Sequence, residues 1–249
     1  MVKFVGIVNV TPDSFSDGGK FFASESARAH AYELYENGAS IIDFGAQSTR
    51  PGASFLSAQE EWQRLEPVIS HLSDAPFDVS IDTFYPEVIE NARKLLPHLI
   101  INDVTMAHSI EMQQLVASSG LRIFLSHLPL SAHGDIQAAH RMKEPIDNVE
   151  QVKNELLLRR DELIKLGTHP EQIILDPGIG FGKTMRCNAE LVEFAKHVPS
   201  LPVMIGFSRK RFIEQFLYLD RFDYSVNASL AKKATALGTA YLRVHEVYR

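Results

Sequence analysis

Residues 172–183 read QIILDPGIGFGK, an apolar run that passes directly into an aspartate and a glycine-rich loop. An apolar run without polar alternation is typical of a parallel strand that is buried on both faces. The aspartate and the glycines then stand at the carboxyl end of that strand, where glycine lets a backbone approach a ligand closely. This stretch therefore predicts one unit of an α/β fold, with a polar site at its strand ends.

The same pattern recurs along the whole chain. Short apolar runs predict strands over Phe4–Val8, Ser40–Phe44, Phe77–Ile81, Leu99–Ile101, Leu121–Leu125, Gln172–Leu175, Val203–Ile205 and Ala240–Val244. Eight strands separated by helical segments predict a single α/β domain over residues 1–249, a (β/α)8 TIM barrel. An open doubly wound sheet is the alternative. The last predicted strand ends five residues before Arg249, so we expect the final helix of the barrel to be absent from this chain. Either the natural protein is longer and this chain is a fragment of it, or another chain covers that strand.

Helix signals lie between the predicted strands. Ser57 and Glu60 form a capping-box pattern ahead of an apolar stripe at helical spacing. Pro67 lies inside that stripe and predicts a kink or a break. Pro86 suits the first turn of a later helix, where a missing N–H costs little.

Composition excludes several classes of protein. Hydrophobic residues make up 45% of the chain and charged residues 22%, which is ordinary for a soluble globular protein. A net charge of −6 disfavours a sequence-independent nucleic-acid binder. The single cysteine, Cys187, cannot form an intrachain disulfide and suits a reducing compartment. No apolar run approaches the roughly 18 residues of a membrane span, so we expect a cytoplasmic protein without a membrane partner.

Polar residues stand at or just after the end of every predicted strand. In chain order they include Asn9, Arg50, Asp82, Asn102, His127, Asp176, Lys210 and Arg243. Because the carboxyl ends of barrel strands converge on one mouth, we expect these side chains to meet there. A purely structural barrel has no reason to place so many polar groups on one rim, so the pattern predicts a functional site.

The residue types indicate the chemistry of that site. The cations of the rim are Arg50, Arg209, Lys210, Arg243 and His245, and cations of this kind bind phosphate oxygens. Asp82, Asn102 and Asp176 offer acceptors and an amide that can read the donor-rich edge of a heterocycle. The Asn9 side-chain oxygen beside a diphosphate suits Mg²⁺, which shares phosphate ligands and keeps most of its waters.

Five segments resemble the dihydropteroate synthase family, in the family's order and over nearly the whole chain. They are Asn9–Gly19, Ser48–Gly52, Leu175–Lys183, Ser208–Lys210 and Arg243–His245. The resemblance implies a pterin-binding (β/α)8 barrel of folate biosynthesis that joins a pterin diphosphate to p-aminobenzoate and is a target of sulfonamides. It also implies a Mg²⁺ cofactor, and either a homodimer or a fusion to another folate-pathway domain.

The resemblance also implies roles for individual residues. The pterin ligands are expected to be Asp82, Asn102, Asp176 and Lys210. The diphosphate ligands are expected to be Arg50, Arg243 and His245, with Asn9 on the magnesium ion. The p-aminobenzoate site is expected to include Thr49, Pro51, Phe181, Ser208 and the stem of Lys210. The catalytic residues are expected to be Asp13, Asp82, Asp176 and Lys210, acting in a dissociative reaction.

The chain departs from the family pattern at defined places. Ala46-Gln47 stands where the family usually has Gly-Glu, and Ser126-His127-Leu128 replaces the familiar Met-His-Met. We therefore expect different hydrogen bonding in the second loop and different packing around the pterin. Two alternatives remain open at this point: a pterin-binding methyltransferase domain, and a non-catalytic paralogue that binds the pterin but forms no product.

Overall fold

The computed structural model describes residues 2–10 and 19–248 and contains one eight-stranded parallel sheet. Its strands are β1 (Lys3–Asn9), β2 (Ala39–Gly45), β3 (Asp78–Asp82), β4 (Ile100–Asp103), β5 (Arg122–Ser126), β6 (Ile173–Asp176), β7 (Met204–Ile205) and β8 (Tyr241–Val244). They pair in the order β6-β5-β4-β3-β2-β1-β8-β7. A parallel bridge between Leu175 and Val203 joins the two ends of this order and closes the sheet into a barrel. All eight predicted strands are confirmed to within two residues at each end.

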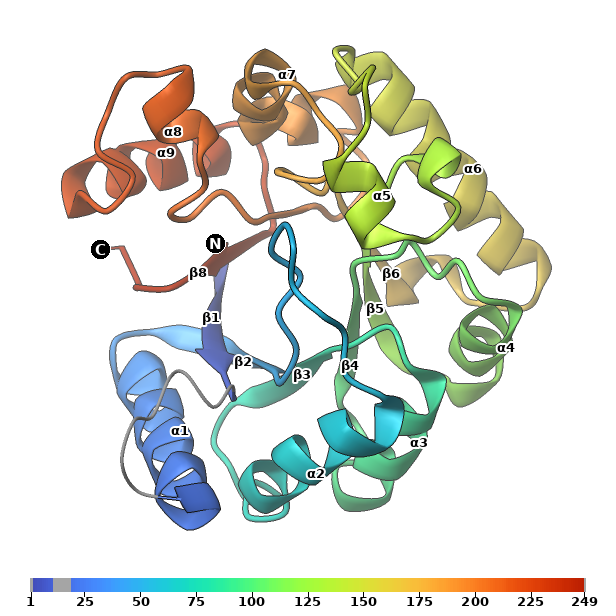
Figure 1. Cartoon of the computed structure of the whole chain (residues 1–249), viewed down its shortest axis with the longest axis vertical. Coiled ribbons are helices and arrows are strands. Elements are labelled where there is room, and N and C mark those ends of the chain that lie inside the picture. The colour runs from blue at the N-terminus through green and yellow to red at the C-terminus, as the bar shows by residue number, and fades with distance from the viewer. Residues whose placement is uncertain (1, 11–18, 249) are drawn as a thin grey trace.

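Helices surround the barrel on its outside (Figure 1). They are α1 (Gly19–Glu36), α2 (Ala58–Ile69), α3 (Pro86–Leu95), α4 (Ile110–Ser119), α5 (Ile136–His140), α6 (Val149–Lys165), α7 (Met185–Glu190), α8 (Phe212–Gln215) and α9 (Tyr224–Ala236). Short 3-10 turns lie at η2 (Leu130–Ala132), η3 (Pro170–Gln172) and η4 (Leu191–His197). Residues 245–248, which follow β8, form no further helix. No described helix is long and apolar enough to cross a membrane.

The predicted capping box and the predicted first-turn proline are confirmed, whereas Pro67 differs from the prediction. The Ser57 hydroxyl accepts a hydrogen bond from the Glu60 backbone N–H at 3.2 Å, and the Glu60 carboxylate accepts from the Ser57 N–H at 2.8 Å. Pro86 opens α3 at its first turn. Pro67 does not interrupt α2 in its middle, because the helix ends at Ile69, only two residues further on. The proline therefore lies in the last turn.

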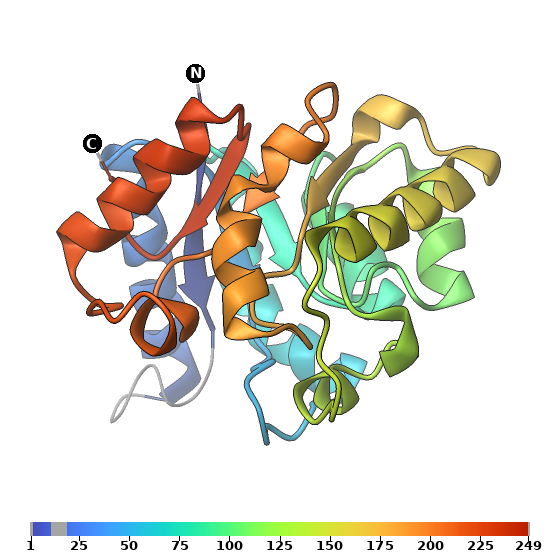
Figure 2. The same cartoon turned by 90° about the horizontal axis from the view of Figure 1, so that it is seen from above.

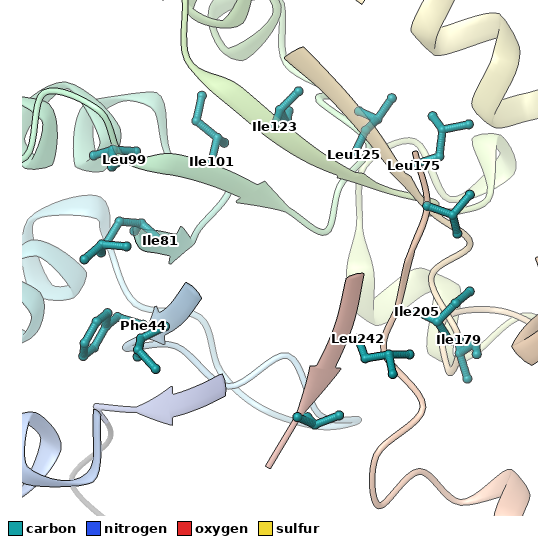
Figure 3. Close-up of a cluster of buried hydrophobic side chains, with 14 of the residues drawn as sticks. Phe44, Ile81, Leu99, Ile101, Ile123, Leu125, Leu175, Ile179, Ile205 and Leu242 are labelled. Carbon is teal, nitrogen blue, oxygen red and sulfur yellow. The ribbon is translucent and has the colours of Figure 1, made fainter. Parts of the chain in front are cut away.

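Side chains on the strands alternate between the barrel interior and the helices, as the pleat requires. The outward set packs beneath the helices and includes Phe44, Ile81, Ile101, Leu125, Leu175 and Leu242 (Figure 3). The inward set forms a separate apolar floor of Val5, Ile41, Ile100, Phe124, Ile174 and Met204. One pleat further along four of these strands, the inward positions are polar: Asp43, Asn102, Ser126 and Asp176. The interior thus changes from apolar to polar toward the carboxyl ends of the strands.

Loops at those ends extend beyond the barrel (Figure 2). The loop between β2 and α2, residues 46–57, reaches across to α5. There the Gln137 side chain hydrogen-bonds the backbone of residues 50, 52 and 53. This contact holds the second loop over the same end of the barrel that carries the polar interior.

Candidate functional site

An ion-paired arginine lies at the centre of the barrel mouth. Arg243 on β8 donates from Nε to Asp43 on β2 and from NH2 to Asp82 on β3, each at 2.6 Å. Burial raises the pKa of Asp82 to about 7, and the neighbouring guanidinium opposes that rise. Although burial works against its charge, the two carboxylates hold the pKa of Arg243 above its usual range. The guanidinium thus remains charged inside the barrel and joins three strands.

Asp43 is a member of the site that the sequence does not single out. It lies within an apolar run, between Ile42 and Phe44, and its side chain is fully buried. The prediction considered the residues that follow each strand, whereas Asp43 precedes the end of β2. A carboxylate inside an otherwise apolar strand was the available signal, because such a charge is rarely buried without partners.

The predicted acceptors lie at the carboxyl ends of β3, β4 and β6, on the same rim of the barrel. Asp82 and Asn102 are register partners on β3 and β4. Asp176 on β6 accepts hydrogen bonds from the Ser126 hydroxyl at 3.0 Å and from the Gly178 N–H at 2.8 Å, which fix its orientation. These three residues are the last or penultimate residues of their strands rather than the first residues of the loops.

The glycine-rich loop after β6 folds back over the mouth. Gly178 has φ of 62°, and a Cβ at this position would lie 2.1 Å from the His127 carbonyl oxygen, so no other residue fits without a backbone shift. The buried Lys183 ammonium donates to the carbonyl oxygens of Gly178 and Phe181, at 2.9 Å each. Lys183 is therefore a structural anchor of this loop.

Lys210 is directed into the mouth from the loop after β7. Its ammonium donates to the Ile179 carbonyl and lies 5.6 Å from the centroid of the Phe181 ring. Burial lowers the pKa of Lys210 to about 8, while Asp176 and Asp82 raise it. The predicted pair of Lys210 and Phe181 is thus in contact, beside two of the predicted acceptors.

The ends of β7 and β8 form a compact polar cluster. The Ser208 hydroxyl contacts the His245 Nδ1 at 3.1 Å and the Tyr248 hydroxyl at 3.2 Å. Burial and the nearby arginines lower the pKa of His245 to about 3, so this side chain is neutral at pH 7. Arg209 forms an ion pair with Glu246. His245 was predicted to be a cation, but its ring is neutral and acts as a hydrogen-bonding group. Arg50 is the exposed cation of the predicted set.

The second loop is fixed at both of its sides. On one side, the Thr49 carbonyl contacts the His140 Nε2 at 2.9 Å, and the Gly52 N–H donates to Gln137 at 2.8 Å. Arg50 and Pro51 are exposed between these contacts. The predicted p-aminobenzoate residues of this loop thus stand above the mouth, on a backbone that α5 holds in place.

On its other side, the loop depends on Gln47, where the chain departs from the family pattern. The Gln47 side chain accepts a hydrogen bond from the Leu56 N–H at 2.7 Å and donates to the Glu61 carboxyl at 3.2 Å. Glu61 is fully buried, and burial raises its pKa to about 8. The expected change in hydrogen bonding is therefore a bond from the half-buried Gln47 amide to the buried Glu61 carboxyl.

The segment after β5 contributes packing rather than polar groups to the mouth. Burial lowers the pKa of His127 to about 4, so it is neutral, and its Nε2 contacts Glu155 at 3.1 Å. Leu128 is almost fully buried in a small apolar cluster, against which Phe181 also packs. Leu128 thus supports one wall of the loop that carries Phe181.

Asn9 ends β1 at the same rim and has an exposed side chain. No group of three or more His, Cys, Asp or Glu residues among the described residues could hold a metal ion alone. A single amide oxygen fits an ion that draws its other ligands from water and phosphate, as Mg²⁺ does. The predicted catalytic residue Asp13 lies outside the described residues.

A closed eight-stranded barrel, with carboxylates, an amide and cations gathered inside its C-terminal mouth, has the architecture of a (β/α)8-barrel enzyme. Comparison with known proteins makes this class specific. The family described as pterin binding enzyme matches residues 5–245. The chain belongs to this family.

Named relatives and solved structures agree with that assignment. The chain is 39% identical to a folate synthesis bifunctional protein of Chlamydia muridarum, over 98% of the chain but only 56% of that protein. It is 38% identical to a dihydropteroate synthase of Neisseria meningitidis serogroup C, over 98% of the chain and 88% of the relative. Its fold is similar to that of Xanthomonas albilineans dihydropteroate synthase with 4-aminobenzoic acid, with a TM-score of 0.86, 33% identity and coverage of 99% and 88%.

Proposed function

We propose that this protein is a dihydropteroate synthase, a transferase that condenses 6-hydroxymethyl-7,8-dihydropterin diphosphate with p-aminobenzoate to give 7,8-dihydropteroate and diphosphate. One observation carries the proposal. Asp82, Asn102 and Asp176 lie together inside the mouth of a barrel, beside Lys210 and Arg243, in a chain that belongs to the pterin-binding family over residues 5–245.

The acceptors suit the pterin ring. A pterin has an amino group and a ring N–H side by side, and a carboxylate held as Asp176 is held can accept from both. The Lys210 ammonium is a donor for the ring carbonyl and ring nitrogen on the opposite edge. Because the pKa of Lys210 is lowered only to about 8, the ammonium is still mostly charged at pH 7.

The reaction needs no protein nucleophile. The bond between the pterin methylene carbon and the diphosphate oxygen breaks, and its electron pair leaves with the diphosphate. The electron-rich ring delocalises the resulting positive charge, and Asp176 and Asp82 stabilise it electrostatically. The lone pair of the p-aminobenzoate nitrogen then forms the new carbon–nitrogen bond, and that nitrogen releases one proton to solvent.

Cationic and neutral donors at the rim would bind the leaving group. Arg50 is exposed on the second loop, and the neutral His245 follows β8, beside the Ser208 hydroxyl that we assign to the p-aminobenzoate site. The Asn9 oxygen would hold a magnesium ion, which when bound neutralises charge on the diphosphate. Arg243 contributes its charge and the guanidinium N–H groups that Asp43 and Asp82 do not engage.

The p-aminobenzoate would lie between the second loop and the glycine-rich loop. Thr49 and Pro51 belong to the first of these, and Phe181 and the stem of Lys210 border the second. The His140 ring lies 5.6 Å from the Phe181 ring and bonds the Thr49 carbonyl, so it links the two loops. We further propose that the enzyme acts in the cytoplasm, either as a homodimer or joined to another folate-pathway domain.

Diphosphate release is the decisive test. The purified chain is mixed with the pterin diphosphate, Mg²⁺ and p-aminobenzoate, and diphosphate and dihydropteroate are both measured. We expect one diphosphate for each dihydropteroate. Methyl transfer to a corrinoid without diphosphate release would identify a methyltransferase instead, and tight pterin binding without any product would identify a non-catalytic paralogue.

A matched pair of variants connects the activity to the site. Lys210→Ala removes a donor from the buried ring edge and should weaken pterin binding at least tenfold, because a charged hydrogen bond contributes about 1.5–3 kcal/mol. Lys232→Ala removes an exposed lysine of α9 and should change nothing. Equal pterin affinity of the two variants would contradict the assignment of Lys210.

A further inference from the structure

The Asp43 carboxylate is the meeting point of hydrogen bonds from three other strands. Ser80 on β3 donates to its Oδ1. Asn102 on β4 and Arg243 on β8 both donate to its Oδ2, at 2.9 Å and 2.6 Å. The Asp43 side chain has no exposed surface, so water cannot replace these donors.

The arginine determines which end of the Asn102 amide faces Asp43. A guanidinium only donates hydrogen bonds, so the Asp43 oxygen that contacts Arg243 must act as an acceptor. The Asn102 group that shares this oxygen is therefore its NH2 group. The other end of the amide, the Asn102 Oδ1 atom, is buried and has no hydrogen-bond partner among the described residues.

The free amide oxygen is a defined acceptor at the site proposed for the pterin. Asn102 lies at the end of β4, in register with Asp82, and only 1% of its surface is exposed. A buried acceptor favours a ligand that brings an N–H to it and disfavours one that brings a carbonyl oxygen, because the mismatch leaves both groups unpaired.

We propose that Asp43 is a positioning residue that sets the specificity of the pterin pocket by fixing the Asn102 amide with its oxygen toward the ring. This inference rests on the proposed function. One N–H of the pterin amino group pairs with Asp176, and its second N–H meets the Asn102 oxygen. The pocket thereby selects a 2-amino ring over a ring with a carbonyl at the same position.

The test compares two ligands across a set of variants. Calorimetry measures the affinity for 6-hydroxymethylpterin and for its analogue with oxygen in place of the amino group. Asp43→Leu removes the acceptor, frees the Asn102 amide to rotate, and should reduce the affinity ratio of the two ligands about tenfold, the value of roughly one hydrogen bond. Asp43→Asn can still present an oxygen to Arg243 and Asn102, so it should keep the ratio within about twofold.

Two further variants separate positioning from structure. Ser80→Ala removes only the donor on the far oxygen of Asp43, and the ratio should again stay within about twofold. In an Asn102→Ala background, Asp43→Leu should no longer change the ratio, whereas any loss of stability should persist. If Asp43→Leu does not fold, Asp43→Ser, which leaves room for water, carries the same expectation.

An unchanged ratio in a folded Asp43→Leu or Asp43→Ser variant overturns the inference, as does a loss of selectivity in Ser80→Ala of equal size. Failure of the wild-type protein to bind 6-hydroxymethylpterin at all would count against the proposed function instead.

Discussion

Replacing Gln47 by alanine tests how the second loop is held over the barrel. In the native chain, the Gln47 side chain links the Leu56 backbone N–H, at 2.7 Å, to the buried Glu61 carboxyl, at 3.2 Å. Alanine removes both contacts without adding bulk. The loop residues Thr49 and Pro51, which we assign to p-aminobenzoate binding, then lose their support on this side.

The magnitude follows from the two groups that are left behind. Losing the bond to the Leu56 N–H costs about 1 kcal/mol, and removing the Gln47 donor from the buried Glu61 carboxyl costs about 1–3 kcal/mol. The free energy of unfolding should therefore fall by roughly 2–4 kcal/mol. For a chain of this length that is a decrease in Tm of roughly 5–15 °C. The KM for p-aminobenzoate should rise more than the KM for the pterin diphosphate.

Scanning calorimetry and initial-rate kinetics measure these effects, with Gln47→Glu as the matched variant. Burial raises the pKa of Glu61 to about 8, so its protonated form can donate to a carboxylate at position 47 below that pH. The raised pKa makes stability fall as pH increases from about 4.5 through 8, and a second carboxylate should steepen that fall. A Gln47→Ala variant with unchanged Tm and unchanged KM for p-aminobenzoate would refute this account of the loop.

Three further substitutions or reagents test other parts of the structure. Gly178→Ala should prevent the native turn, because its Cβ would lie 2.1 Å from the His127 carbonyl oxygen. We expect calorimetry to show a loss of pterin binding, and a retained affinity would contradict the turn geometry. Burial lowers the pKa of Lys183 to about 7, so the stability of the wild type relative to Lys183→Met should rise between pH 7 and about 10.5; parallel urea-denaturation profiles would contradict this. Burial raises the pKa of Cys187 to about 11, so a thiol reagent at pH 8 should label it only after unfolding, and rapid labelling of the native protein would show that it is accessible.

Much of the fold and part of the site could be predicted from the sequence, because the signal is local. Each strand of the barrel is buried on both faces, so its residues form a short apolar run with polar groups directly after it. Asp82, Asn102 and Asp176 were found in this way. Because the carboxyl ends of barrel strands converge on one mouth, these residues could be placed together before their contacts were known.

The remaining site residues depend on partners that are distant in sequence. Asp43 lies one pleat before the end of its strand, and only the register of the sheet shows that it faces inward with Asn102. The pairing of Gln47 with Glu61 joins a loop to a helix, and Glu61 lies within a polar stretch in which nothing distinguishes it from its neighbours. Such contacts are set by tertiary packing, so no local pattern predicts them.

The ion pairs of Arg243 have a consequence for the stage of synthesis at which the protein becomes able to bind its ligand. This arginine is 200 residues from Asp43 and 161 residues from Asp82 along the chain. Contacts of such long separation close late in folding, since the entropy of a large loop must be lost before they form. During synthesis, the two carboxylates emerge first and remain without their cation until the last strand leaves the ribosome. A nascent chain that stops before residue 243 would therefore keep a hydrated, unfinished interior, and ligand binding would report that translation has passed this point.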